Sequence, residues 1–390
     1  MKIAVVCDSF KGSLTSKDAC AAVKDGLLRC NKNFEVLSLP FADGGEGTSR
    51  CFYDILGGQL RKASVHDPLL REITAEYTVL PDGTDVIDVA SASGLTLLKS
   101  SERDAVKVSS LGSGELICDA AEHGAKHIIL GLGGSATTDA GTGILYALGM
   151  RFFSEDGAEV LPDGQNMIRV KKIRRTENFE RFKDIKFTLA CDVTNPLCGE
   201  NGAAYVFAPQ KGASKNDVEL LDDGLRNIGE IFEKASGKKI IDLPGAGAAG
   251  GIGGGLSAFL NCELQSGFDV LARAASLEDK IRRSDAVITG EGKTDRQTLF
   301  GKLPKRVSDI AEKFGVPCIL LSGDVENDIS AEKLGVCEIH KIKENGISLE
   351  HCMKNAASLL SERAFAIGKD SKIINKQYSR KQEKMRENER

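Results

Sequence analysis

Residues 1–40 read MKIAVVCDSFKGSLTSKDACAAVKDGLLRCNKNFEVLSLP. Two runs rich in β-branched and other apolar residues, at positions 3–7 and 34–39, predict two strands. Between them, apolar residues recur at the spacing of one helix face: Ala19, Ala22, Val23 and Leu27. Ser16 is a favourable cap for this helix, and Asp18 in its first turn suits the helix dipole. Strand, helix and strand form a βαβ unit, the building block of a parallel sheet covered by helices.

Similar strand-like runs alternate with amphipathic stretches through the rest of the chain. They lie at positions 86–90, 127–130, 187–190, 286–289 and 318–321. The run at 73–80 differs, because Pro81-Asp82-Gly83-Thr84 joins it to the run at 86–90 and predicts a hairpin. We therefore expect an α/β protein in which one domain has a mainly parallel sheet and another has a mixed sheet.

Composition narrows the classes of function. The chain has 390 residues, of which 41% are hydrophobic, which suffices for two modest cores. Its 52 basic and 56 acidic residues give a net charge of −4, and it has no Trp, so nucleic acid is not expected as a partner. Neither an H-E-x-x-H nor a G-x-S-x-G motif occurs, which disfavours a zinc protease or an α/β-hydrolase.

Eleven cysteines without a C-x-x-C pair are typical of a protein from a reducing compartment. The chain enters a strand-like run directly after Met1 and has no apolar run of about 18 residues. We expect a cytoplasmic protein with no membrane partner.

The first glycine-rich loop follows the expected strand at 127–130 and reads Gly131-Leu132-Gly133-Gly134-Ser135-Ala136-Thr137-Thr138-Asp139. A helix is expected at 140–148. Such a loop points backbone N–H groups and hydroxyls at an anion, so it predicts phosphate or carboxylate binding. A tight turn capped by the same hydroxyls is the alternative.

The same loop matches the dinucleotide fingerprint G-x-G-x-x-A, with Glu155 about 20 residues further on. That match is weak, because such a site normally lies in the first βα turn of its domain. Here the first turn of the chain is Asp8-Ser9-Phe10-Lys11-Gly12-Ser13. It lies at the carboxyl end of a strand, the edge of an open α/β sheet where ligands bind. A solvated turn is the alternative.

Two acidic loops follow other strands. They read Asp43-Gly44-Gly45-Glu46-Gly47-Thr48 and Asp192-Val193-Thr194-Asn195-Pro196. Carboxylates at strand ends are suitable ligands for Mg²⁺ or bases for a substrate hydroxyl. Ordinary surface turns also favour Asp-Gly and Asn-Pro, so each loop alone stays ambiguous.

The loop Thr289-Gly290-Glu291-Gly292-Lys293-Thr294-Asp295 resembles a P-loop but is not one, because position 287 is Val instead of Gly. It nevertheless brings a lysine and two carboxylates into one turn, and Lys302 opens the next helix. Lysines beside carboxylates could neutralise a triphosphate and hold a metal. A second glycine-rich segment, with seven glycines, spans residues 245–255.

In their order along the chain, these loops resemble the bacterial glycerate kinase family up to about residue 370. Two of the segments extend to the blocks Cys191 to Leu197 and Pro244-Gly245-Ala246-Gly247-Ala248-Ala249-Gly250-Gly251, and one further block reads Phe207-Ala208-Pro209-Gln210-Lys211-Gly212-Ala213. Small departures are Cys7 in place of an expected proline and Asp88 in place of an expected glutamate.

The resemblance implies ATP- and Mg²⁺-dependent phosphorylation of D-glycerate to 2-phosphoglycerate. It also implies a Rossmann-like parallel-sheet domain from both chain ends, a second mixed-sheet α/β domain inserted in it, and a site in the cleft between them. The expected bounds are 1–66 plus 283–370 for the first domain and 67–282 for the inserted one. Residues 371–390 form a charged tail without a counterpart.

On this basis each motif has an expected role. Catalytic residues are Asp43, Lys293 and Asp192, with Asp43 as base. Phosphate or ATP binding is expected at Gly133, Gly134, Ser135, Thr137, Thr138, Gly250, Gly251 and Gly253. Substrate binding is expected at Asp8, Ser9, Lys11 and Glu46. Magnesium ligands are expected at Asp192 and Asp295.

Two other classes stay open at this point. An NAD-dependent hydroxy-acid dehydrogenase would use residues 131–136 with Glu155. A non-catalytic nucleotide- or anion-binding protein would bind ATP without consuming it. The sequence leaves a monomer and a homodimer equally open.

Overall fold

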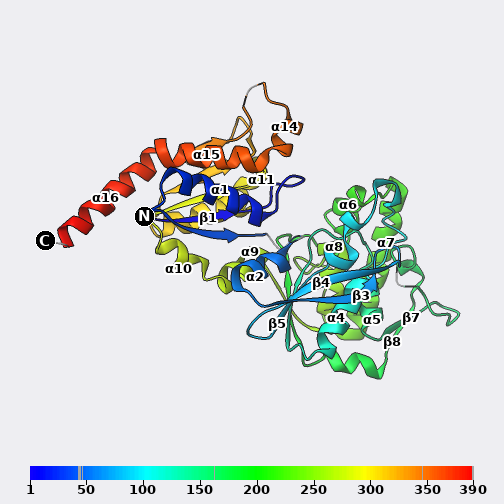
Figure 1. Cartoon of the computed structure of the whole chain (residues 1–390). Coiled ribbons are helices and arrows are strands. Elements are labelled where there is room, and N and C mark those ends of the chain that lie inside the picture. The colour runs from blue at the N-terminus through cyan, green and yellow to red at the C-terminus, as the bar shows by residue number, and fades with distance from the viewer. Residues whose placement is uncertain (43–44, 46, 162, 345, 389–390) are drawn as a thin grey trace. The chain divides into compact units, whose positions relative to one another are not determined.

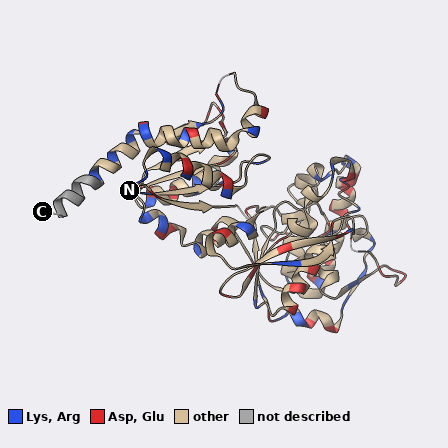
Figure 2. Cartoon of the chain, viewed as in Figure 1, with Lys and Arg blue, Asp and Glu red and all other residues tan. Residues whose placement is uncertain are grey.

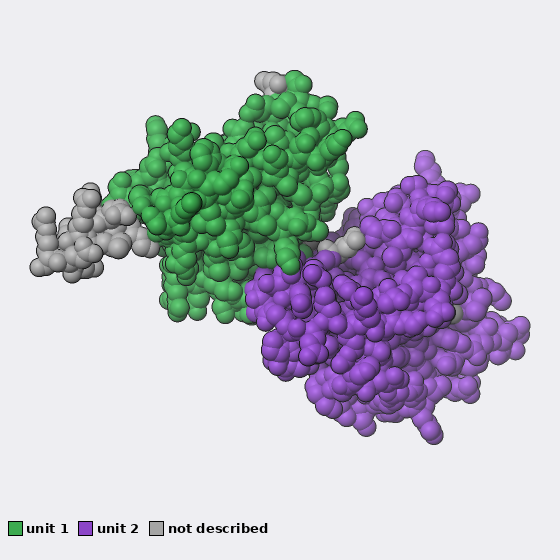
Figure 3. Space-filling model, viewed as in Figure 1, with its two compact units in different colours: residues 1–43, 271–390 green, residues 44–270 purple. Residues whose placement is uncertain are grey.

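The computed structural model describes residues 1–42, 45, 47–161, 163–344 and 346–388, with side chains described as far as residue 380. The chain divides into two compact units (Figure 3). Unit 1 consists of Met1–Asp43 and Leu271–Arg390, and unit 2 of Gly44–Val270. The expected insertion of one α/β domain into another is confirmed. These bounds differ from the expected ones near residues 66 and 283.

Unit 1 contains a parallel sheet in the order β15-β13-β11-β1-β2. Numbered by their rank along the chain, these strands follow the order 2-1-3-4-5 of flavodoxin-like doubly wound folds. The order reverses between β1 (Lys2–Cys7) and β11 (Ala286–Gly290), where Cys7 pairs with Gly290. Ligands of such sheets bind beside the carboxyl ends of the strands at this switch point.

Helices cover both faces of this sheet (Figure 1). On one face, α1 (Ser16–Cys30) and α15 (Ala356–Asp370) pack together and against the side of the sheet that carries Ile3 and Val5. α12 (Leu303–Lys313) contacts β11 and β13 with its buried Leu303 and Val307. The remaining elements of unit 1 are β2 (Glu35–Pro40), α10 (Leu277–Arg282), β12 (Lys293–Thr294), α11 (Arg296–Leu299), β13 (Cys318–Ser322), β14 (Asp324–Val325), α13 (Ala331–Leu334), β15 (Glu338–Lys341), α14 (Leu349–Lys354) and α16 (Lys372–Asn388).

The start of α1 shows a small difference from the expectation. Its N-cap is Thr15 instead of Ser16, and the Thr15 hydroxyl accepts a hydrogen bond of 3.1 Å from Asp18 N–H. Ser16 is the first helical residue, and its hydroxyl donates to the Phe41 carbonyl at 2.8 Å. Thr15 and Ser16 carry similar hydroxyls, so the sequence alone did not show which of them caps the helix. The hydrogen bond from Ser16 to Phe41 leaves Thr15 as the cap.

The charged C-terminal segment forms helix α16, which begins as part of unit 1. Ile374 is fully buried, and the Tyr378 ring packs edge-on against Phe34 with their centroids 5.8 Å apart. The first turns of α16 therefore add apolar contacts to the core of unit 1.

Unit 2 contains a mixed sheet in the order β10-β9-β6-β5-β4-β3. β10 (Asn261–Gln265), β9 (Lys186–Ala190), β6 (His127–Gly131) and β5 (Thr84–Asp88) are mutually parallel. The expected hairpin is confirmed, because β4 (Glu72–Val79) pairs antiparallel with β5. β3 (Gln59–His66) pairs with β4 over its whole length, so it belongs to this sheet.

The helices of unit 2 surround this sheet and its core. The remaining elements are α2 (Thr48–Leu56), α3 (Ala90–Ser93), η1 (Leu95–Leu97), η2 (Ser100–Glu102), α4 (Leu111–Glu122), α5 (Thr142–Ala147), β7 (Met150–Phe153), η3 (Met167–Arg169), β8 (Lys172–Arg175), η4 (Glu177–Phe182), α6 (Ala203–Phe207), η5 (Pro209–Lys211), α7 (Lys215–Ser236) and α8 (Ala248–Phe259). α9 (Gly267–Ala274) carries the chain from unit 2 back to unit 1.

Basic and acidic residues alternate over the helices and loops of both units (Figure 2). All eleven cysteines are free thiols. Within the described residues, every helix is too short or too polar to cross a membrane.

Candidate active site

Unit 1 has a cavity of about 680 Å³ at the switch point of its sheet. It lies where the chain leaves β1, β11 and β13, and helices α14 and α15 close one side. Its lining residues are Asp8, Ser9, Phe10, Lys11, Ser13, Glu291, Gly292, Lys293, Asp295, Lys302, Gly323, Asp324, Ile342, Lys343, Leu349, Cys352, Met353 and Ala356. Five expected site residues are therefore brought together: Asp8, Ser9, Lys11, Lys293 and Asp295.

The turn after β1 forms one wall of the cavity. Asp8 N–H continues the ladder by donating to the Gly290 carbonyl at 2.9 Å, and the Asp8 carboxylate accepts from Ser9 N–H at 2.6 Å. Lys11 is exposed at the tip of the turn. Among the described residues it has no ion-pair or hydrogen-bond partner, so its charge is available to a ligand.

A second wall extends β11 and β13 by the short parallel pair β12 and β14, in which Lys293 lies beside Asp324. This close approach requires glycine, since a Cβ on Gly323 would lie only 2.1 Å from the Gly292 carbonyl oxygen. Gly290 of the predicted loop has a similar packing function, because a Cβ there would lie 2.1 Å from the Leu321 carbonyl oxygen. The Lys293 side chain lines the cavity.

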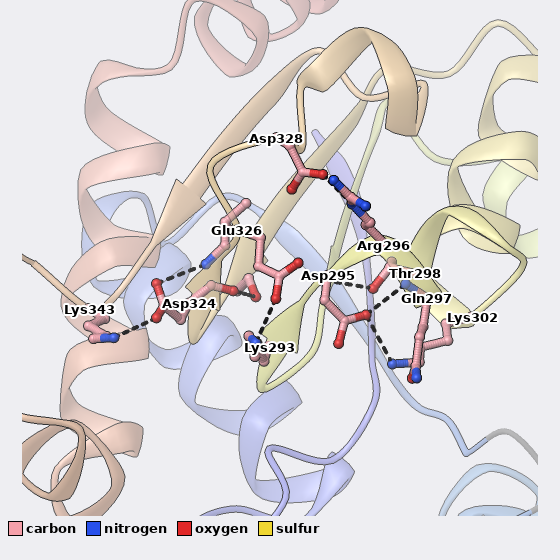
Figure 4. Close-up of polar contacts among 12 residues, drawn as sticks. Lys293, Asp295, Arg296, Gln297, Thr298, Lys302, Asp324, Glu326, Asp328 and Lys343 are labelled. Carbon is pink, nitrogen blue, oxygen red and sulfur yellow. Dashed lines mark hydrogen bonds and ion pairs between the residues drawn. The ribbon is translucent and has the colours of Figure 1, made fainter.

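Lysine–carboxylate pairs line this wall (Figure 4). Lys293 Nζ lies 2.7 Å from Glu326 Oε1, and Lys343 Nζ lies 2.6 Å from Asp324 Oδ2. The hydrogen bond from Lys293 to Glu326 raises the pKa of the lysine, so it stays charged. Both lysines are partly exposed, and pairs of this kind contribute only about 0–1 kcal/mol. An incoming phosphate or carboxylate can therefore replace their partners.

Asp295 caps a helix and also lines the cavity. It is the N-cap of α11, where Oδ1 accepts from Gln297 N–H at 2.9 Å and lies 3.4 Å from Lys302 Nζ. The neighbouring Glu291 is buried and accepts a bond of 2.7 Å from the Thr298 hydroxyl. Burial raises the pKa of Glu291, which reduces the negative charge that it adds to the cavity.

The structure offers no preformed metal cage: among the described residues, no three His, Cys, Asp or Glu side chains are placed to hold one ion. Carboxylates of Asp8, Asp295 and Asp324 nevertheless line the cavity. Magnesium is commonly bound by one or two carboxylates together with water and substrate phosphates, so these donors fit it.

In unit 2, the predicted anion loop follows β6 as expected, and its accessible part is small. Gly133 and Gly134 reach the surface, whereas Ser135, Thr137 and Thr138 are buried. The hydroxyls of Thr137 and Thr138 have no hydrogen-bond partner among the described residues.

A lysine to which the sequence assigned no role lies beneath this loop. Lys211, from η5, is buried, and its ammonium donates to Ser135 Oγ at 3.0 Å and to the Thr137 carbonyl at 2.6 Å. Burial lowers the pKa of Lys211 to about 8, and the charge of Asp139 opposes that shift. The only sequence signal was its position inside one of the blocks that carry the family resemblance.

Asp139 is the buried carboxylate at the end of this loop. It accepts from Ser110 N–H at 2.8 Å, from the Ser110 hydroxyl at 2.7 Å and from Gly141 N–H at 3.1 Å. Burial raises the pKa of Asp139, and these hydrogen bonds oppose that rise.

The second glycine-rich segment packs directly on the anion loop. A Cβ on Gly250 would lie 2.0 Å from the Thr137 carbonyl oxygen, and one on Gly251 would lie 2.9 Å from Ala140 Cα. A Cβ on Gly253 would lie 2.4 Å from the Gly245 carbonyl oxygen. These three glycines have a packing function that the sequence did not distinguish from phosphate binding.

The dinucleotide fingerprint lacks its structural context. Glu155 is exposed in the turn after β7, which pairs antiparallel with β8 in a separate small sheet. A dinucleotide fold would need a parallel strand next to β6 at that point.

Three predicted site residues remain: Asp192, Asp43 and Glu46. Asp192 is exposed just after β9 in unit 2. Asp43 and Glu46 lie outside the described residues. Just after them in sequence, Gly47 N–H and Ser49 N–H donate to the buried Asp88 at the end of β5, at 3.0 Å and 3.1 Å. Asp88 thereby holds the start of α2 at a small cavity of about 200 Å³.

Comparisons with known proteins agree with this picture. A family model described as the glycerate kinase family matches residues 3–372. A glycerate kinase of Halalkalibacterium halodurans is 38% identical over 364 residues, which cover 93% of this chain and 96% of that protein. A glycerate 2-kinase of Escherichia coli is 41% identical over 330 residues, covering 84% of this chain and 87% of that protein.

A solved structure agrees as well. The crystal structure of a protein assigned as glycerate kinase 2 from Salmonella typhimurium LT2 superposes with a TM-score of 0.83 at 35% identity. The match covers 95% of this chain and 97% of that one.

Proposed function

Because this chain belongs to the glycerate kinase family, we propose that it transfers the γ-phosphoryl group of ATP to D-glycerate with the help of Mg²⁺. The bond between the γ-phosphorus and the β–γ bridging oxygen breaks, and a bond to the 2-hydroxyl oxygen of glycerate forms. A base accepts the hydroxyl proton, and the products are ADP and 2-phosphoglycerate. The name of the Escherichia coli relative supports the 2-position.

The observation that carries this proposal is the lysine-rich cavity at the switch point of unit 1. Phosphoryl transfer requires mainly positioning and neutralisation of charge. Among the described residues, Lys11 is unpaired and Lys293 pairs with the partly exposed Glu326. Both can therefore turn to an anionic ligand at little cost, and Asp8 and Ser9 line the same cavity.

The loop of unit 2 supplies an anion site of a second kind. Gly133 and Gly134 present accessible backbone, and the ammonium of Lys211 lies beneath Ser135 and Thr137. A buried positive charge under accessible N–H groups favours a phosphate or a carboxylate. Gly250, Gly251 and Gly253 support this loop by close packing.

Carboxylates complete the proposed machinery. Asp295, at the cavity of unit 1, would hold Mg²⁺, which neutralises charge on the phosphates when it is bound. Asp192 is assigned as a Mg²⁺ ligand on the basis of its sequence motif. Asp43 is assigned as the base and Glu46 as a substrate-binding group on the basis of their sequence motif. The free thiols support a reducing, cytoplasmic location.

The test is ADP release from ATP and Mg²⁺ with D-glycerate present or absent, followed by identification of the product. We expect ADP release that depends on glycerate, and 2-phosphoglycerate as the product. Folded protein that releases no additional ADP with D-glycerate would contradict the proposal. Formation of 3-phosphoglycerate would contradict the assigned hydroxyl alone.

A further inference from the structure

One side of the cavity in unit 1 is apolar, and the charged groups do not explain it. We call this side the apolar lobe; it is formed by Phe10, Ile342, Leu349, Cys352, Met353 and Ala356. Phe10, Ile342, Cys352 and Ala356 are buried. In contrast, 60% of Leu349 and 38% of Met353 remain exposed, although both are large apolar side chains. Exposed apolar groups concentrated at a cavity are typical of a ligand-binding surface.

Three residues of the apolar lobe belong to the capped helix α14. Ser348 caps α14 by accepting a bond of 3.2 Å from His351 N–H, and Leu349, Cys352 and Met353 follow at the spacing of one helix face. Met353 reaches the turn after β1, because a Cβ on Gly12 would lie 2.9 Å from its Cε atom. The apolar side chains of α14 therefore lie next to the turn that carries Lys11.

The size of the cavity favours a ligand larger than a three-carbon acid. At about 680 Å³, it falls within the roughly 300–1,000 Å³ of pockets that enclose drug-sized molecules. Its lining combines Lys11, Lys293, Lys302 and Lys343 with the apolar lobe. A ligand that matches both kinds of lining has a polyanionic part and an apolar part, which is the chemistry of a nucleoside triphosphate.

We infer that the cavity of unit 1 binds the nucleotide, with its purine base against Leu349 and Met353 and its phosphates toward Lys11 and Lys293. This inference rests on the proposed function in taking ATP as the phosphoryl donor. It assigns the base to a helix for which the sequence motifs predicted no role.

The test separates the base from the phosphates. ATP and inorganic tripolyphosphate are titrated into the full-length protein by calorimetry, for the wild type and for Leu349→Ser and Met353→Ser. Losing one apolar contact should weaken ATP binding by roughly tenfold, whereas the affinity for tripolyphosphate should stay within about twofold. Leu349→Ser should fold normally because the side chain is already mostly exposed.

Phe300→Ser is the matched control. Phe300 is 90% exposed in the same unit and does not line the cavity, so its loss should leave both affinities unchanged. Unchanged ATP affinity in both lobe variants would overturn the inference. Weaker binding of D-glycerate with unchanged ATP binding would also overturn it, by assigning the cavity to the acid. ATP binding that depends on Leu349 in a protein without glycerate-dependent turnover would keep the base site and reject the proposed reaction.

Discussion

The ammonium of Lys211 lies 2.6 Å from the Thr137 carbonyl oxygen, and only 3% of the Lys211 residue is exposed. A buried charge is costly unless it is hydrogen-bonded, and here both bonds go to the anion loop, the second one to Ser135 Oγ at 3.0 Å. These hydrogen bonds connect η5, which contains Lys211, with the loop after β6. The conformation of the predicted anion site thus depends on a residue far from it in sequence.

Replacing Lys211 by Met should destabilise the protein. The variant leaves Ser135 Oγ and the Thr137 carbonyl without their donor, and a buried unsatisfied group costs about 1–3 kcal/mol. We expect the free energy of unfolding in urea to fall by about 2 kcal/mol at pH 7. Lys215→Met, at the exposed start of α7, is the control and should change it by less than about 0.5 kcal/mol. Equal stability of the two variants would show that the buried bonds contribute nothing.

The same lysine should make stability depend on alkaline pH. Its folded pKa, about 8, lies below the value of about 10.4 of an unfolded lysine. Between these values the unfolded chain binds more protons, so the contribution of Lys211 to stability rises with pH. The difference in unfolding free energy between wild type and Lys211→Met should grow by about 2 kcal/mol from pH 8 to pH 10. A constant or shrinking difference would contradict the lowered pKa.

Lys11→Ala should reduce kcat/KM by about 100-fold, because the variant removes a charge that serves the ligand. Lys11 is exposed and has no ion pair among the described residues, so the unfolding free energy should stay unchanged. Lys24→Ala, an exposed lysine of α1, is the matched control and should keep full activity. The measurement is kcat/KM from steady-state kinetics with ATP and D-glycerate. A kcat/KM of Lys11→Ala within threefold of wild type would exclude this lysine from the mechanism.

Asp295→Asn should separate metal binding from helix capping. Asparagine can still accept the hydrogen bond of Gln297 N–H, so the N-cap of α11 and the stability should be retained. The loss of charge should raise the Mg²⁺ concentration for half-maximal activity by roughly tenfold. Asp328→Asn, whose carboxylate pairs with Arg296 outside the cavity, should leave the Mg²⁺ dependence unchanged. An unaltered Mg²⁺ titration for Asp295→Asn would exclude it as a ligand.

Gly250→Ala tests whether the second glycine segment serves packing. Gly250 has a φ of +70°, and a Cβ there would lie 2.0 Å from the Thr137 carbonyl oxygen. Gly157 has a φ of +80° with no atom near its Cβ position, so Gly157→Ala should cost only the backbone strain of about 1–2 kcal/mol. Gly250→Ala should cost at least about 2 kcal/mol more in unfolding experiments. Equal stability together with lost ATP binding would instead support a direct phosphate contact.

Several features of the fold could be predicted from the sequence because they depend on local patterns. The apolar runs at 3–7 and 34–39 placed β1 and β2 within one residue of their bounds, and the helical spacing of apolar residues from 19 to 27 placed α1 between them. The turn at Pro81 to Thr84 predicted the β4–β5 hairpin. The meeting of Asp8 and Lys293 in one cavity could also be anticipated, since parallel strands place their carboxyl ends at one edge of a sheet.

Other features were decided only by the tertiary structure. Lys211 and Ser135 are 76 residues apart, and nothing in the local pattern of either indicates that one is buried against the other. The glycines at 250, 251 and 253 look like a phosphate loop in sequence, whereas their neighbours in space are other backbone segments. The apolar lobe likewise requires α14 to lie beside the turn after β1. Local patterns determine where helices and strands form, because they depend on neighbouring residues. Burial, pKa and the shape of a site depend on which distant segments pack together, and that is a property of the folded chain alone.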